Sequence, residues 1–149
     1  ERQGGGCDLM EIRDAVYKDL EYFMPIFVMV HSKSMFKDIE INEAAIQRNF
    51  VVAMAFDDGY AKVVEKDGEL VGGLIGMIAE NHFGIRCAQD LFNFSRYGTD
   101  QLLKDFIAWA EFREASFIQI TDMTHNGRYE KLCRLVELQP SGTNYAKVM

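Results

Sequence analysis

The sequence predicts a single α/β (α+β) domain, with a mixed, mostly antiparallel sheet of about six strands that helices cover. Three observations support this fold class. The chain has 149 residues, 48% hydrophobic and 26% charged, which is typical of one soluble globular domain. Asp67-Gly68 separates two strand-like segments, a strong signal for an antiparallel hairpin. The later chain alternates short apolar runs with helical patterns, which indicates a strand–helix–strand crossover.

The chain is expected to form its domain over residues 10–149. Residues 1–9 are oddly composed, and we expect them to be an artificial or disordered extension, with Met10 as the natural start. Residues 10–13 predict a short first strand.

Two helices are predicted next. Apolar residues recur at helical spacing from Asp19 onward, with Pro25 inside the pattern, so either a kink or a late helix start is expected. Asn42 is a suitable N-cap for the second helix, because its side chain can accept a hydrogen bond from a free backbone N–H.

The predicted hairpin joins residues 60–66 to residues 69–80. Three glycines interrupt the side chains of its second strand, namely Gly72, Gly73 and Gly76. They indicate either a twisted or bulged strand, or a place where a ligand closely approaches the backbone.

The last third of the chain predicts alternating strands and helices. Residues 86–94 and 117–121 predict strands, and Thr99 is expected to cap the helix between them. A closing strand is expected over residues 143–149, with Tyr145 packed in the structure. The final helix carries an apolar stripe formed by Tyr129, Leu132, Cys133 and Val136.

Composition excludes several classes of function. A net charge of −7 argues against a nucleic-acid partner. No apolar run reaches 18 residues, so no membrane-spanning helix is expected. The three cysteines are scattered and odd in number, which favours a reduced, cytoplasmic protein without disulfides. The three histidines stand apart from the cysteines and from one another, so no metal site is expected.

Several short motifs follow one another in a recognisable order: Met10-Glu11-Ile12-Arg13-Asp14-Ala15, then residues 63–73 ending in Gly72-Gly73, then Trp109-Ala110. They resemble, in turn, the opening strand, the central hairpin and a feature of the long helix of the GCN5-related N-acetyltransferase (GNAT) superfamily. The ending Gly142-Thr143-Asn144-Tyr145-Ala146-Lys147 resembles GNAT proteins encoded by tailed phages.

The resemblance implies helices on both faces of the sheet and a V-shaped opening between the fourth and fifth strands, into which acetyl-CoA enters. The pantetheine would pair with the backbone of Leu91, Phe92 and Asn93. The pyrophosphate would bind N–H groups at the start of the next helix. Asn126 resembles an asparagine that contacts the cofactor in relatives. The expected pyrophosphate loop spans residues 95–100, and its candidate cofactor contacts are Arg96, Tyr97, Gly98 and Thr99.

This loop departs from the family pattern. Gly98 is its single glycine, and Asp100 places a negative charge in the first turn of the helix. That charge stabilises the helix but repels a pyrophosphate, and Arg96 would compensate in part. The alternative to a pyrophosphate site is that Arg96-Tyr97-Gly98 forms a plain strand-to-helix turn without a ligand.

The resemblance also suggests catalytic residues. Amine acetylation needs a base for the ammonium proton and an acid for the leaving thiolate. Relatives often use a carboxylate on the fourth strand, which points to Asp90, with Glu65 and Glu80 behind it. The alternative for Asp90 is a solvated or salt-bridged residue. The acid position in the last helix falls on or near Cys133, which also fits a buried structural cysteine, and Tyr129 lies one turn earlier.

Two functions are therefore expected. The first is an N-acetyltransferase that moves an acetyl group from acetyl-CoA to an amine of a small molecule or protein. The alternative is a weak or inactive GNAT-fold protein with a binding or structural role, for example in a phage particle. An α+β module without CoA binding is a third reading.

Relatives often dimerise, so a homodimer is one expectation. Asp57-Asp58 would attract a cationic amine or be simply solvated.

Overall fold

The computed structural model of the chain describes residues 9–122, 127–142 and 144–149. Within them, one five-stranded sheet has its strands in sequence order. Neighbouring strands are antiparallel, except that the fourth and fifth are parallel. The strands are β1 (Met10–Asp14), β2 (Gly59–Lys66), β3 (Glu69–Glu80), β4 (Arg86–Ser95) and β5 (Phe117–Gln119).

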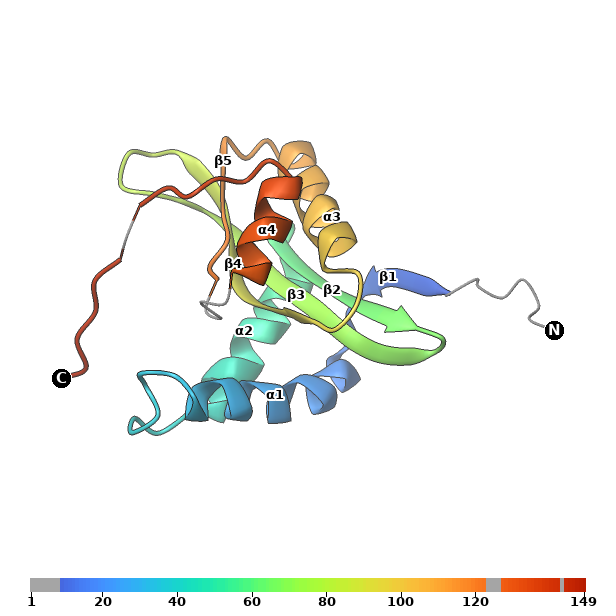
Figure 1. Ribbon diagram of the computed structural model, residues 1–149, viewed down its shortest axis with the longest axis vertical. Helices are drawn as coiled ribbons and strands as arrows, with labels where there is room; N and C mark the ends of the chain where they lie inside the picture. Colours follow the sequence, from blue (N-terminus) through green and yellow to red (C-terminus); the bar gives the residue numbers. More distant parts are fainter. Residues whose placement is uncertain (1–8, 123–126, 143) are drawn as a thin grey trace.

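Helices cover both faces of the sheet, as Figure 1 shows. On one face, Phe23 and Phe50 of the first two helices pack against Ile75. On the other face, Phe106 of the third helix packs against Leu74, and the fourth helix lies beside it. The α+β class and the two helical layers are confirmed. The helices are η1 (Tyr17–Asp19), α1 (Leu20–Ser32), α2 (Glu43–Ala55), α3 (Thr99–Phe112) and α4 (Arg128–Leu135).

The local signals for the hairpin and the second helix are confirmed. Asp67 and Gly68 both have positive φ, at 53° and 84°, as a two-residue type I′ turn requires. The Asn42 side chain accepts a hydrogen bond from the backbone N–H of Ala45 at 2.9 Å, which caps α2. Helix α1 continues through Pro25 after a short 3₁₀ turn.

Two glycines of β3, Gly73 and Gly76, make room for aromatic rings of the core. A Cβ atom on Gly73 would lie 2.5 Å from the Phe23 ring on one face of the sheet. A Cβ atom on Gly76 would lie 2.8 Å from the Phe106 ring on the other face. The close approach that these glycines permit is therefore to the protein's own side chains.

The expected closing strand is absent from the described residues. Residues 144–149 have no regular structure, and Tyr145 is 93% exposed rather than packed. Figure 1 shows this segment leading away from the sheet. The sheet therefore has five strands instead of about six. Strand β5 is also shorter than expected, ending at Gln119, so it offers a sixth strand only a short edge.

Replacing Gly76 by alanine is expected to destabilise the fold. The new methyl group would lie 2.8 Å from both the Phe106 ring and the Gln89 carbonyl oxygen. Overpacking of this kind costs about 1–3 kcal/mol in the free energy of unfolding, which urea denaturation measures. The exposed Glu69→Ala change on the same strand is the control and should stay within about 0.5 kcal/mol of wild type. Equal stability of Gly76→Ala and wild type would contradict the packing argument.

Candidate active site

Strands β4 and β5 separate after a short paired region. Their last pair joins Gln89 to Gln119, whereas β4 continues to Ser95. Residues 90–95 therefore have no partner strand on the β5 side among the described residues. We call this segment the open edge. It lies where the V-shaped opening was expected, between the fourth and fifth strands, and a strand edge of this kind can pair with an extended ligand.

A β-bulge begins the open edge. Opposite β3, Asp90 pairs with Gly76 and Phe92 pairs with Ile75, so Leu91 is the extra residue. The Phe92 side chain packs on the α1 face, with its ring centroid 4.1 Å from that of Phe27. Leu91 is 46% exposed. The Phe92 side chain is thus committed to the core, whereas that of Leu91 is exposed.

Asp90 stands where the two strands separate, and its carboxylate connects them. Its Oδ1 accepts a hydrogen bond from the backbone N–H of Thr121 at 3.0 Å, beyond the end of β5. Its Oδ2 accepts one from the side-chain amide of Asn93. Burial raises the pKa of Asp90, and these hydrogen bonds offset the rise only in part. The carboxylate is thus half-buried and bonded to uncharged donors, rather than solvated.

Helix α4 brings two proton-bearing groups toward Asp90. Tyr129 and Cys133 lie one turn apart, and both are half-buried. Burial is the main cause that raises the pKa of each, and the carboxylates of Asp90 and Asp122 raise both further. Both groups therefore keep their protons at neutral pH. The Tyr129 hydroxyl is buried without a hydrogen-bond partner within the described part of the chain.

The loop before α3 has the geometry of a strand-to-helix turn, and no side chain caps the N-terminus of the helix. Gly98 is the N-cap residue, with a φ of 69°, and the Met10 side chain fills the space where a Cβ would project. Thr99 does not cap the helix as expected, because its hydroxyl donates to the Ser95 carbonyl at 3.3 Å. A left-handed backbone at Gly98 positions the turn, which is why Thr99 lies one residue too late to cap.

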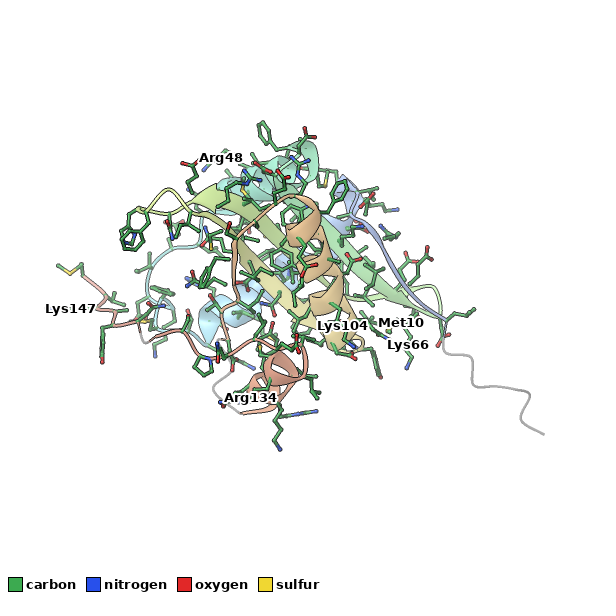
Figure 2. The ribbon with its side chains drawn as sticks, turned by 90° about the horizontal axis from the view of Figure 1, so that it is seen from above. Met10, Arg48, Lys66, Lys104, Arg134 and Lys147 are labelled. Atoms are coloured by element: carbon green, nitrogen blue, oxygen red, sulfur yellow. The ribbon has the colours of Figure 1, made fainter. Side chains whose placement is uncertain are left out.

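Positive charge lies beside this helix start. The Lys66 ammonium sits 3.8 Å from the centre of the Tyr97 ring. Figure 2 shows Lys66 next to Met10, its partner across β1 and β2. Arg96 is exposed in the same loop, whereas Asp100 places a negative charge in the first turn of α3. No side chain caps α3, so its first backbone N–H groups can bind an anion. The negative charge of Asp100 disfavours an anion at the same place.

Several other candidates lie apart from this cluster. Glu65 pairs with Arg13 at 2.9 Å, and Glu80 is exposed at the end of β3. Asp58 does not serve as a free attractor for a cationic amine, because Arg86 and Arg113 hold it at 2.9 and 3.2 Å. Asn126 lies outside the described residues.

Sequence reasoning missed the Asn93 side chain, which it assigned only a backbone role. Asp90 and Asn93 are three residues apart, so a regular strand would place them on opposite faces. Only the bulge at Leu91 brings them together. The sequence carries no signal for that bulge beyond the glycine at position 76 on the neighbouring strand.

Other kinds of site find no support in the described residues. They contain no helix long and apolar enough to cross a membrane, and no group of three or more His, Cys, Asp or Glu side chains that would hold a metal ion. A cavity of about 340 Å³ lies between α3 and α4, where Ile107 and Leu135 line it. None of the residues that line this cavity belongs to the open edge. We therefore identify the candidate site by the titratable groups that gather near Asp90 and not by the cavity.

The Asp90→Asn variant is expected to gain stability relative to wild type as the pH rises. The pKa of Asp90 is raised in the folded state, so the folded protein binds the proton more tightly than the unfolded chain does. Ionisation above about pH 4 therefore weakens wild type but not the variant. Urea unfolding at about pH 3 and about pH 7 measures the difference. A difference that stays constant or moves against the variant would show that Asp90 is not buried in this way.

Comparisons with known proteins agree on the fold. No protein-family model and no curated protein matches the sequence. Among solved structures, glucosamine-6-phosphate N-acetyltransferase from Arabidopsis thaliana is 10% identical, with a TM-score of 0.66, over 95% of this chain and 99% of that one. A transcriptional regulator from Bacillus halodurans C-125 is 17% identical, with a TM-score of 0.70, over 95% of this chain and 100% of that one.

A third structure contains a ligand that includes CoA. AAC(6')-Iy in complex with the bisubstrate analogue CoA-S-monomethyl-acetylneamine is 14% identical, with a TM-score of 0.65, over 95% of this chain and 99% of that one. At such low identities, these likenesses establish architecture rather than activity. Together with the sheet order, the two helical layers and the separation of β4 from β5, they show that the chain has the fold of the GCN5-related N-acetyltransferases.

Proposed function

We propose that the protein is an N-acetyltransferase that uses acetyl-CoA and acts on an amine of a small molecule or a protein. The observation that carries the proposal is the open edge of β4, which begins at Asp90 opposite Tyr129 and Cys133 of α4. The strand edge and the Asp90 carboxylate lie where the sheet divides, and Asp90 acts electrostatically on both side chains of α4, to which we assign the role of proton donor. The likeness to structures of acetyltransferases adds support at the level of fold.

The described residues fit acetyl-CoA in most respects. The backbone of Leu91, Phe92 and Asn93 lies on the open edge and offers the pairing that the amides of pantetheine need. The uncapped start of α3 offers N–H groups to the pyrophosphate. Asp100 opposes the pyrophosphate and is the one feature that does not fit. The residues proposed around the pyrophosphate are Arg96, Tyr97, Gly98 and Thr99, with Asn126 proposed as a further contact.

Asp90 would act as the general base. Acetyl-CoA supplies the acetyl group as an activated thioester. The attacking amine must be neutral, and Asp90 accepts the proton that the ammonium group gives up. Because burial raises the pKa of its carboxyl group, Asp90 is a stronger base than a solvated aspartate. The oxygens that accept from Thr121 and Asn93 each keep a second lone pair for that proton.

Two groups of α4 are candidates for protonating the leaving thiolate. The buried Tyr129 hydroxyl has no partner among the described residues, and an unpaired buried donor costs about 1–3 kcal/mol. A sulfur atom at the open edge would satisfy it. Cys133 is the better match in acidity, since a thiol and a leaving thiolate have similar intrinsic pKa values. Substitution of Tyr129 and of Cys133 in turn distinguishes the two candidates.

A second candidate function is a GNAT-fold protein that binds CoA or another partner without efficient catalysis, for example as a phage component. Two observations favour it. Asp100 weakens the anion site, and the Asp90 carboxylate already connects β4 to the chain beyond β5. The same fold also occurs in a protein described as a transcriptional regulator.

Calorimetry with acetyl-CoA, followed by a thiol-release assay over a panel of amines, distinguishes the two functions. Binding of acetyl-CoA without thiol release supports the second function. No binding at millimolar acetyl-CoA refutes the first.

Asp90→Asn is expected to lower kcat/KM by about a hundredfold, because a general base contributes roughly 10²–10⁴ in rate. Acetyl-CoA affinity should change little, since the amide keeps the acceptor oxygen that Thr121 uses. The thiol-release assay and calorimetry measure the two effects. Glu80→Gln is the control, because this exposed carboxylate lies at the other end of the hairpin strand. Turnover within threefold of wild type in Asp90→Asn would refute the assignment.

Tyr129→Phe and Cys133→Ser are expected to give unequal losses. If the phenol protonates the thiolate, Tyr129→Phe lowers kcat by about tenfold or more, while Cys133→Ser leaves it within about threefold. If the thiol does so, the order reverses. Melting temperatures show whether either loss reflects unfolding. Full activity in both variants would leave α4 without a proton donor and contradict the proposed arrangement.

A further inference from the structure

We propose that Asn93 is a positioning residue for Asp90: its side-chain amide holds the carboxylate in the orientation used for proton transfer. The inference rests on the proposed acetyltransferase function and deepens it. It is carried by the hydrogen bond from the Asn93 amide to Asp90 Oδ2 and by the bulge that makes this bond possible.

The bulge at Leu91 puts the two side chains on one face. In a regular strand, side chains alternate, so residues separated by three face opposite ways. The pairing of Asp90 with Gly76 and of Phe92 with Ile75 leaves Leu91 without a partner, which restores a common face for Asp90 and Asn93. Gly76 accommodates the irregular segment, because any side chain there would meet the Gln89 carbonyl oxygen.

The two hydrogen bonds restrain the carboxylate at both oxygens. Oδ1 accepts from the Thr121 N–H and Oδ2 accepts from Asn93, so rotation of the carboxylate plane would break both bonds. The Thr121 donor is part of the backbone and remains in any variant. Asn93 therefore supplies the restraint that depends on a side chain, and restraint of a reacting group in one orientation favours the transition state.

The other titratable groups around Asp90 cannot replace this amide. Asp122, beyond β5, acts on Tyr129 and Cys133 of α4, and Glu130 acts on Cys133 while Arg134 pairs with Glu130 at 2.8 Å. On the β3 side, Asp90 pairs with a glycine. The acidic and neutral groups among these do not favour the ionised carboxylate. The amide of Asn93, the N–H of Thr121 and the backbone N–H of Asp90 itself do so.

The direct test titrates the Asp90 carboxyl carbon by NMR in the protein without ligands. In Asn93→Leu, which is nearly isosteric, the midpoint of Asp90 should move to higher pH, because a donor to the charged form is lost. The matched control is Asn49→Leu on the exposed side of α2, which should leave the midpoint unchanged. In the thiol-release assay, the acidic limb of kcat/KM should move in the same direction, with about a tenfold loss below the midpoint.

An unchanged Asp90 midpoint in Asn93→Leu would overturn the inference. If that variant fails to fold, Asn93→Asp replaces it and should move the midpoint upward through charge repulsion. The titration needs no acetyl-CoA, so it separates this inference from the proposed function. An inactive wild type refutes the function by itself. A midpoint that moves while the pH profile of an active enzyme does not would restrict Asn93 to a structural role.

Discussion

The candidate site depends on one constraint: β4 must stay paired with β3 along its whole length while it leaves β5 after Gln89. Strand β5 is parallel and only three residues long, so the sheet divides at that point. The division exposes a strand edge, places Asp90 at its beginning and directs the chain beyond β5 toward α4. The hydrogen bond between Asp90 and the Thr121 N–H holds the two sides at a fixed separation.

Charge is distributed unevenly around this division. The carboxylates of Asp90 and Asp122 act on the half-buried Tyr129 and Cys133 of α4, whereas Glu130 is paired with Arg134 at 2.8 Å, so this end carries a local excess of negative charge. The other end, at the start of α3, combines free N–H groups with Lys66 and Arg96. Although the chain carries a net charge of −7, an anionic cofactor would meet its phosphate groups at the less acidic end. Asp100 is the exception, and it is why a weakly catalytic protein remains the second candidate.

Features that depend on a few neighbouring residues were predictable from the sequence. The Asp67-Gly68 turn and the Asn42 cap were confirmed, because turn and cap chemistry act over two to four residues. The cap predicted at Thr99 was wrong, because the left-handed Gly98 takes the N-cap position. Asp90 was selected through a family resemblance and lies where the strands part. The predictions of a closing strand and of a packed Tyr145 were wrong, because a strand forms only where a partner edge is available. Asn126 lies outside the described residues, and its role stays a prediction.

The sequence by itself determined the fold class, the hairpin and the acidic character of the chain, since periodicity, turn residues and charge are properties of short segments. The two helical layers were implied by the family resemblance. Only the tertiary structure decided that Leu91 is a bulge, that Asn93 therefore meets Asp90, and that aromatic rings fill the gaps left by Gly73 and Gly76 of β3. The register between strands and the packing between layers depend on residues far apart in the chain, so no local pattern encodes them.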